Sequence, residues 1–228
     1  MKPRVVVLRP EPGNAETADR AAARGFDVMR LPLFAVRPLA WTPPEPDGFD
    51  ALLMTSAAAV RHAGAGLAAL TRLPVVAVGE ATAAAARAAG LMLAATGDEG
   101  VATALGAARA HGLTRLLHLA GRERMPDQPG VRAIPVYASD PLPVAPGTTR
   151  TLAEGRTALL HSPRAARRLS ELVGRDATLR AAIAIAALSP AVLAAAGEGW
   201  RSGLAAGHPT DAALLDLLES PLRSTPRD

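Results

Sequence analysis

The chain has 228 residues, of which 49% are hydrophobic and 20% charged, and it contains no cysteine. The missing cysteines exclude a disulfide framework, a thiolate nucleophile and a Cys-ligated metal. No apolar run reaches the roughly 20 residues needed to cross a bilayer, and the apolar run after Met1 is too short for a signal peptide. We therefore expect a cytoplasmic protein that does not engage a membrane.

The formal net charge is +4, and almost all of the basic residues are arginine. A guanidinium group binds carboxylate or phosphate through a planar fork of donors, so the arginines are consistent with an acidic ligand. A general bias toward Ala and Arg along the chain explains them equally well. Nucleic acid is not an expected partner, because aromatic residues make up only 3% of the chain and offer few stacking platforms.

Short apolar runs alternate with Ala-rich stretches of helical periodicity, a pattern typical of βα units and parallel sheets. In chain order, we predict strands at residues 4–8, 27–31, 51–54, 75–78, 91–94, 115–119, 133–137, 157–160, 183–188 and 203–206. We predict helices at residues 14–24, 57–70, 81–89 and 101–111, among others. The Pro-rich stretches 38–46 and 141–149 are predicted to be linkers or loops.

The chain contains a weak internal repeat. Residues 53–61 resemble residues 159–167, and residues 77–81 resemble residues 187–191. Each copy has a strand, a small polar turn and a helix, which predicts two similar α/β halves. Chance similarity between Ala-rich segments is the alternative explanation.

The turns after the predicted strands carry small polar residues. In His161-Ser162-Pro163 and Leu188-Ser189-Pro190, serine occupies the N-cap and proline the first helical position. Such turns lie at the carboxyl ends of the strands in open α/β sheets, where ligands bind. Helix N-termini at that edge favour anions. Ordinary helix capping explains any one of these turns.

Competing motifs are absent. The stretch Gly64-Ala65-Gly66 follows a predicted helix rather than a strand, which argues against a dinucleotide fingerprint. The five histidines show no spacing typical of a metal site. Ser162 lacks the glycine-flanked elbow of a hydrolase nucleophile. We expect no metal.

An ordered series of segments carries a family resemblance. These segments are Val6-Val7-Leu8-Arg9-Pro10 with Gly13, residues 49–60 around Thr55-Ser56, Ala77-Val78-Gly79-Glu80-Ala81-Thr82, Leu117-His118-Leu119-Ala120-Gly121-Arg122, Val136-Tyr137, residues 159–164, Leu188-Ser189-Pro190 and Pro209-Thr210. Together and in this order they resemble the uroporphyrinogen-III synthases. The short, Pro-rich stretch 123–130 departs from the family.

The resemblance implies an α/β fold of two flavodoxin-like parallel-sheet domains, joined by a two-stranded linker, with a ligand cleft between them. Domain one would comprise residues 1–34 and 138–228, and domain two residues 39–131. The linker strands would lie at residues 32–38 and 132–138.

The resemblance also implies an activity in haem biosynthesis. The family's substrate is hydroxymethylbilane, a linear tetrapyrrole with eight carboxylates. Loss of its terminal hydroxyl gives an electrophilic azafulvene, and a spiro rearrangement inverts the last ring before closure to uroporphyrinogen III. We expect a monomeric lyase that needs no metal or redox cofactor. The alternative is a non-catalytic two-domain protein that binds a small anion or a tetrapyrrole.

The resemblance extends to individual residues. Tyr137, the only tyrosine, is the catalytic candidate, because its phenol is able to assist departure of the hydroxyl. Packing on a linker strand is the other explanation for this residue. The expected substrate-binding residues are Arg9, Thr55, Ser56, Gly79, Thr82, Gly121, Arg122, Ser162, Ser189 and Thr210. For Arg9 and Arg122, the alternative is an arginine at the surface that contacts only solvent. For Thr82 and Thr210, the alternative is a simple helix cap.

Overall fold

The structure, a computed structural model, describes residues 3–97, 100–124 and 128–219. The chain folds into two compact units. Unit 1 comprises Met1–Ala35 and Pro141–Asp228, and unit 2 comprises Val36–Asp140. The chain passes between the units twice, in strands β3 (Phe34–Pro38) and β8 (Val131–Pro141).

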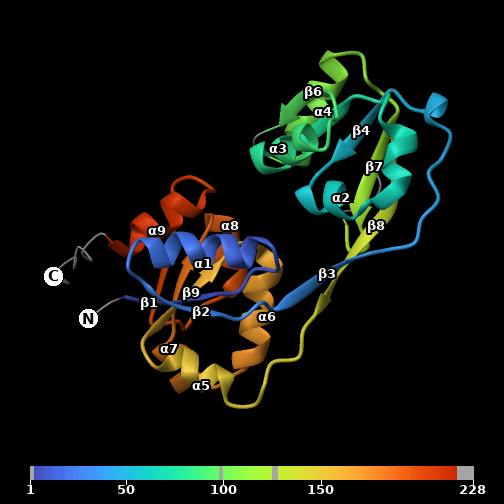
Figure 1. Ribbon diagram of the computed structural model, residues 1–228. Helices are drawn as coiled ribbons and strands as arrows, with labels where there is room; N and C mark the ends of the chain where they lie inside the picture. Colours follow the sequence, from blue (N-terminus) through green and yellow to red (C-terminus); the bar gives the residue numbers. More distant parts are fainter. Residues whose placement is uncertain (1–2, 98–99, 125–127, 220–228) are drawn as a thin grey trace. The chain divides into compact units, whose positions relative to one another are not determined.

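Unit 1 contains a five-stranded sheet in the order β11-β10-β9-β1-β2, in which every pairing is parallel (Figure 1). Its strands are β1 (Arg4–Val7), β2 (Asp27–Arg30), β9 (Arg156–Leu160), β10 (Ala184–Ala187) and β11 (Ser202–Ala205). The central strands are short apolar runs buried on both faces, as expected for a parallel sheet covered by helices. Numbered along the unit, the order is 2-1-3-4-5, as in flavodoxin.

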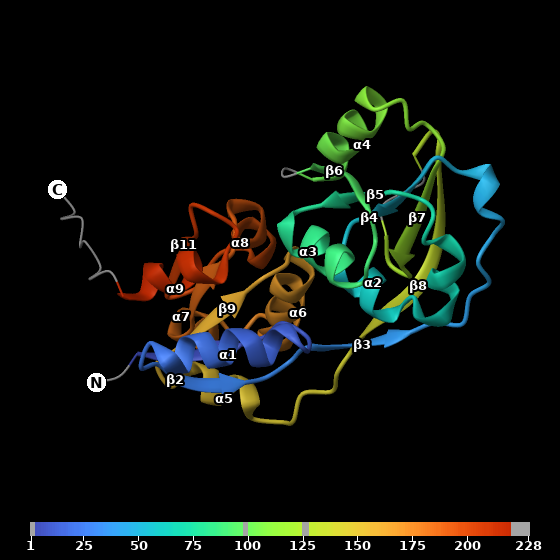
Figure 2. The same cartoon turned by 45° about the horizontal axis from the view of Figure 1, so that its top comes forward.

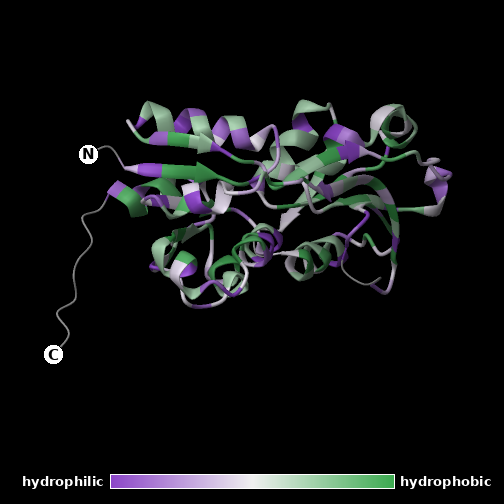
Figure 3. Cartoon of the chain, turned by 90° about the horizontal axis from the view of Figure 1, so that it is seen from below, coloured by the Kyte–Doolittle hydropathy of each residue, from purple (hydrophilic) through white to green (hydrophobic). Residues whose placement is uncertain are grey.

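Helices cover both faces of the unit 1 sheet. On one face, α1 (Gly13–Ala23) and α9 (Asp211–Glu219) pack on Val5 and Val7. On the other face, α5 (Thr148–Ala153), α6 (Pro163–Val173) and α8 (Pro190–Ala196) share a core with Val6 and Leu8. The short helix α7 (Ala177–Ala182) precedes β10. In Figure 3 the helices carry both hydrophobic (green) and hydrophilic (purple) residues. This mixture is expected for helices that pack one side on a sheet and expose the other side to solvent.

Unit 2 contains a six-stranded sheet in the order β3-β8-β7-β4-β5-β6. Its remaining strands are β4 (Ala51–Met54), β5 (Val75–Val78), β6 (Leu93–Gly97) and β7 (Leu116–Gly121). One face carries α2 (Ala57–His62), the 3-10 helix η2 (Gly64–Leu70) and α3 (Glu80–Ala88). The opposite face carries α4 (Val101–Ala110), which packs on Leu53 and Leu116 (Figure 2). A further 3-10 turn, η1 (Pro46–Gly48), precedes β4.

The two units share one strand arrangement. The order β2-β1-β9-β10-β11 in unit 1 corresponds to β8-β7-β4-β5-β6 in unit 2. The first two strands of unit 1 thus have their counterparts at the end of unit 2, as in a circular permutation. This correspondence explains the sequence repeat, because residues 53–61 and 159–167 both run from the central strand into the following helix.

One connection differs in length between the units. In unit 1, residues 8–26 join β1 to β2 and contain α1. In unit 2, residues 122–130 join the corresponding strands β7 and β8, and the described part of this stretch contains no helix. Residues 125–127, part of the Pro-rich departure noted in the sequence, lie outside the described residues. The described residues of unit 2 therefore contain no counterpart of α1.

The predicted α/β class with parallel sheets is confirmed, and two local predictions are wrong. The single helix at residues 57–70 is interrupted after His62, because Gly64 takes a φ of +63° and the chain continues as a 3-10 helix. The strand predicted at 91–94 begins only at Leu93. Within the described residues, no helix is long and apolar enough to cross a membrane.

Candidate functional site

The predicted site residues gather at the carboxyl edges of the two sheets, because parallel strands all end at the same edge. The edge of unit 1 carries Arg9, Ser162, Ser189 and Thr210. The edge of unit 2 carries Thr55, Ser56, Gly79, Thr82, Gly121, Arg122 and Tyr137. Each unit therefore has its own group of candidates.

Four of the hydroxyl residues act as helix caps. Each side-chain oxygen accepts a backbone N–H from the first turn of the helix that follows. The pairs are Ser56 with Ala58 (3.2 Å), Ser162 with Ala165 (3.2 Å), Ser189 with Val192 (3.4 Å) and Thr210 with Ala213 (3.2 Å). The predicted capping by Ser162 and Ser189 is confirmed, and these bonds account for the hydroxyl groups without a ligand.

Gly79 and Thr82 belong to the start of α3. Gly79 has a φ of +76°, a conformation that a residue with a side chain rarely adopts. Its carbonyl accepts the N–H groups of Thr82 and Ala83, both at 3.1 Å. Thr82 is only 4% exposed, so its side chain lies in the interior rather than at the surface of the turn.

A hydrogen-bonded cluster around Asp211 lies at the carboxyl edge of unit 1. The carboxylate accepts from Thr17 Oγ1 (2.7 Å), Arg20 Nη1 (2.5 Å), His161 Nε2 (3.0 Å) and, more distantly, Arg9 Nη1 (3.5 Å). Burial alone would raise the pKa of Asp211, but the hydrogen bonds from His161 and Thr17 outweigh it and hold that pKa well below its usual range.

Arg9 and Arg20 carry the positive charge of this cluster. Burial lowers the pKa of His161, so its imidazole is neutral near pH 7. Both guanidinium groups pair with the Asp211 carboxylate, and Arg20 Nη2 also lies 4.0 Å from Glu16 Oε2. Gly13 lets Arg9 approach α1 closely, because a Cβ there would lie 2.5 Å from the guanidinium carbon.

Arg122 has a different environment. It pairs with Glu123 at 3.2 Å and with Asp140, which also accepts from Arg37 at 2.6 Å. The hydrogen bond that Arg122 donates to Asp140, followed by the one that it donates to Glu123, raises the pKa of Arg122. Two carboxylates therefore balance two guanidinium groups around Arg122.

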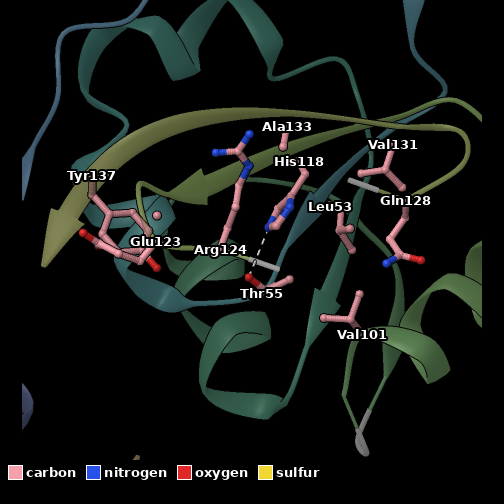
Figure 4. A pocket seen from close by; sticks show the side chains of 11 residues that line it. Leu53, Thr55, Val101, His118, Glu123, Arg124, Gln128, Val131, Ala133 and Tyr137 are labelled. Carbon is pink, nitrogen blue, oxygen red and sulfur yellow. Dashed lines mark hydrogen bonds between the residues drawn. The ribbon is translucent and has the colours of Figure 1, made fainter. Parts of the chain in front are cut away.

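A pocket of about 220 Å³ lies within unit 2, lined by residues of β4, β7 and β8 and extending to the carboxyl ends of β4 and β7. It is lined by Leu53, Thr55, Val101, His118, Gly121, Glu123, Arg124, Gln128, Val131, Ala133 and Tyr137. Strand β4 and its neighbour β7 are where the strand order of the unit reverses, the usual ligand position in an open α/β sheet. Figure 4 shows Tyr137 at one end of the pocket and Val101 and Gln128 at the other.

Tyr137 is positioned by Gly121, its partner across β7 and β8. A Cβ on Gly121 would lie 2.9 Å from Tyr137 Cζ and 3.0 Å from its hydroxyl oxygen, so the phenol ring packs directly on the glycine backbone. The ring of His62 lies 6.4 Å from the Tyr137 ring between centroids. Burial lowers the pKa of His62.

His118 is a pocket residue that sequence reasoning did not select. Its Nε2 lies 3.1 Å from the hydroxyl oxygen of Thr55, toward which it points in Figure 4. The signal in the sequence was one polar residue inside the apolar run Leu116–Gly121. Asp211 was also missed, because an acidic residue at the start of a helix is common on any surface.

No three His, Asp or Glu side chains form a possible metal site anywhere in the part of the chain that the structure describes.

The family model for "Uroporphyrinogen-III synthase HemD" matches residues 15–216. The chain belongs to the uroporphyrinogen-III synthase family. Members of this family are enzymes of haem biosynthesis.

Solved uroporphyrinogen-III synthases have the same fold. The uroporphyrinogen-III synthetase of Helicobacter pylori is 16% identical, with a TM-score of 0.66, over 96% of this chain and 99% of that one. A mutant uroporphyrinogen III synthase of Thermus thermophilus is 18% identical, with a TM-score of 0.59, over 98% of this chain and 100% of that one. At these identities the likeness shows the fold alone. The search of curated proteins returned no match.

Proposed function

We propose that this protein cyclises hydroxymethylbilane to uroporphyrinogen III as a lyase, with no metal or redox cofactor. Membership of the family supports the reaction and its substrate. We further propose that the enzyme works as a cytoplasmic monomer. The reaction demands mainly that a flexible polyanion be held in one orientation, and orientation contributes several kcal/mol to lowering a barrier.

The observation that carries the proposal is the position of Tyr137. The only tyrosine of the chain lines the pocket with its ring held against Gly121. In the proposed first step the C–O bond of the hydroxymethyl group breaks, and the phenol protonates the departing oxygen, which leaves as water. The azafulvene closes the ring, and the product then loses one carbon-bound proton. This proton returns to the phenolate, so the enzyme gains and loses no proton over the whole reaction. A positioned proton donor contributes about 10²–10⁴-fold to a rate.

Binding of the substrate carboxylates is assigned to the edges of the two sheets. In unit 1, the guanidinium groups of Arg9 and Arg20 support this role, together with the first turns of α6 and α9. In unit 2, the backbone N–H groups that open α3 behind Gly79 support it. Most anion binding would then come from backbone donors, so no single side chain would be indispensable for affinity.

The test is to supply hydroxymethylbilane to the purified protein with a metal chelator present, and to separate the uroporphyrin isomers after oxidation. We expect the type III isomer to dominate. Formation of type I alone, at the rate seen without protein, would refute the proposed function. Tight tetrapyrrole binding with that same outcome would identify the chain as a non-catalytic binder.

A further inference from the structure

The pocket in unit 2 lies on the sheet face that α1 covers in unit 1. There, Ala18 and Ala21 of α1 share a core with Val5 and Val7 of β1. The counterparts of β1 and β2 in unit 2 are β7 and β8, which residues 122–130 connect without a helix in their described part. Among the described residues, no helix equivalent to α1 lies on the α4 face beside these strands.

Much of the pocket lining belongs to that face, whereas Tyr137 packs against the core cluster on the α2 side. Leu53, Val101 and Val131 are part of the cluster that packs around α4. In the sheet, His118 of β7 lies opposite Leu53 of β4 on one side and opposite Ala133 of β8 on the other. Side chains of paired residues project to the same face of a sheet. The pocket therefore reaches from α4 to Tyr137.

The pocket has the size and chemistry for a single aromatic ring. Its volume of about 220 Å³ is below the roughly 300–1,000 Å³ of sites for drug-sized ligands. Apolar side chains such as Leu53 and Val131 would contact the ring faces, and among the polar lining residues Arg124 and Gln128 carry N–H groups that would donate to carboxylates of the ring. When the Thr55 hydroxyl donates to His118 Nε2, its oxygen lone pairs are able to accept a pyrrole N–H.

We propose that this pocket binds one carboxylate-bearing pyrrole, the terminal ring that carries the hydroxymethyl group, next to Tyr137. This inference rests on the proposed function and names which part of the substrate this pocket takes. His118 then acts as a positioning residue, because its contact orients the Thr55 hydroxyl toward the ring nitrogen.

The test uses porphobilinogen, a monopyrrole with one acetate and one propionate, as the probe. Ala133→Phe places a bulky side chain in the pocket, and Ala102→Phe makes the same change at an exposed position of α4. We expect Ala133→Phe to weaken porphobilinogen binding at least tenfold in calorimetry, and to raise KM for hydroxymethylbilane more than it lowers kcat. Ala102→Phe should leave both values within twofold of the parent protein.

Thr55→Val tests the polar floor of the pocket without filling it. A neutral hydrogen bond contributes roughly 0.5–1.5 kcal/mol, so porphobilinogen should bind about 2- to 12-fold more weakly. Thr71→Val, at an exposed threonine of the same unit, is the control. His118→Gln should weaken binding in the parent background but not in the Thr55→Val background, a coupling that a purely structural role would not produce.

Two results would overturn the inference while leaving the enzyme assignment intact: no porphobilinogen binding by an active parent enzyme, or unchanged binding in a folded Ala133→Phe protein. If Ala133→Phe does not fold, Val101→Trp from the opposite wall of the pocket replaces it under the same criterion. Pocket-dependent porphobilinogen binding by a protein that forms only type I isomer would support the ring site and refute the proposed function.

Discussion

Gly121→Ala is expected to displace the Tyr137 phenol without straining the backbone. Gly121 does not have a positive φ, so alanine is compatible with its conformation. The new Cβ would lie 2.9 Å from Tyr137 Cζ. Since carbon atoms prefer a separation of about 3.5–4.0 Å, the ring must retreat by roughly 0.6–1.1 Å. A displacement of about 1 Å at a reacting group costs up to about 10²-fold in rate, so we expect kcat to fall about 10- to 100-fold.

The assay is steady-state formation of uroporphyrinogen III from hydroxymethylbilane, with thermal unfolding as a check of the fold. The matched control is Gly106→Ala, at an exposed helical glycine whose added Cβ would meet no atom within 4 Å. In a Tyr137→Phe background, Gly121→Ala should lower kcat by less than about threefold further, because the two changes act on the same phenol. A folded, fully active Gly121→Ala protein would refute the claim that Gly121 positions the catalytic phenol.

Two further predictions concern Tyr137 and Asp211. Tyr137→Phe should lower kcat by about 10²–10⁴-fold, whereas Arg9→Ala should lower kcat/KM only about tenfold; a reversed ranking would make Arg9 the more important group. Asp211→Asn should lower the free energy of unfolding by about 1.5–3 kcal/mol, the contribution of hydrogen bonds to a charged group. The control Asp216→Asn, in an exposed ion pair, should lower it by at most about 1 kcal/mol. Because the pKa of folded Asp211 is depressed, its stabilisation should be present above about pH 4 and lost as the pH falls below it. Denaturant titrations from pH 3 to 7 check this, and an unchanged acid dependence in Asp211→Asn would contradict it.

Local chemistry made much of the fold predictable from the sequence. The strands β4 and β5 have the predicted bounds, because each is an apolar run of four residues between polar, proline or glycine residues. The caps Ser162 and Ser189 were predictable because their contacts lie within three residues along the chain. β6 was displaced because the apolar run around Met92 begins before the strand.

The partners of the site residues were not predictable in the same way. Asp211 meets Thr17 across 194 residues, and Thr55 meets His118 across 63. Such contacts depend on strand order, which no local pattern specifies. The short stretch after Arg122 was visible as a departure from the family, but the lack of a counterpart of α1 among the described residues appears only when the two units are compared.

The central claim is that the reacting end of the substrate lies against Tyr137, and the single tyrosine of the chain allows a direct measurement. Protein labelled with ¹³C in the tyrosine ring would be titrated anaerobically with uroporphyrinogen III and followed by NMR. We predict that the Tyr137 ring signals shift and saturate with the same dissociation constant that calorimetry gives. Saturating product binding by calorimetry, with unchanged Tyr137 signals, would contradict the account.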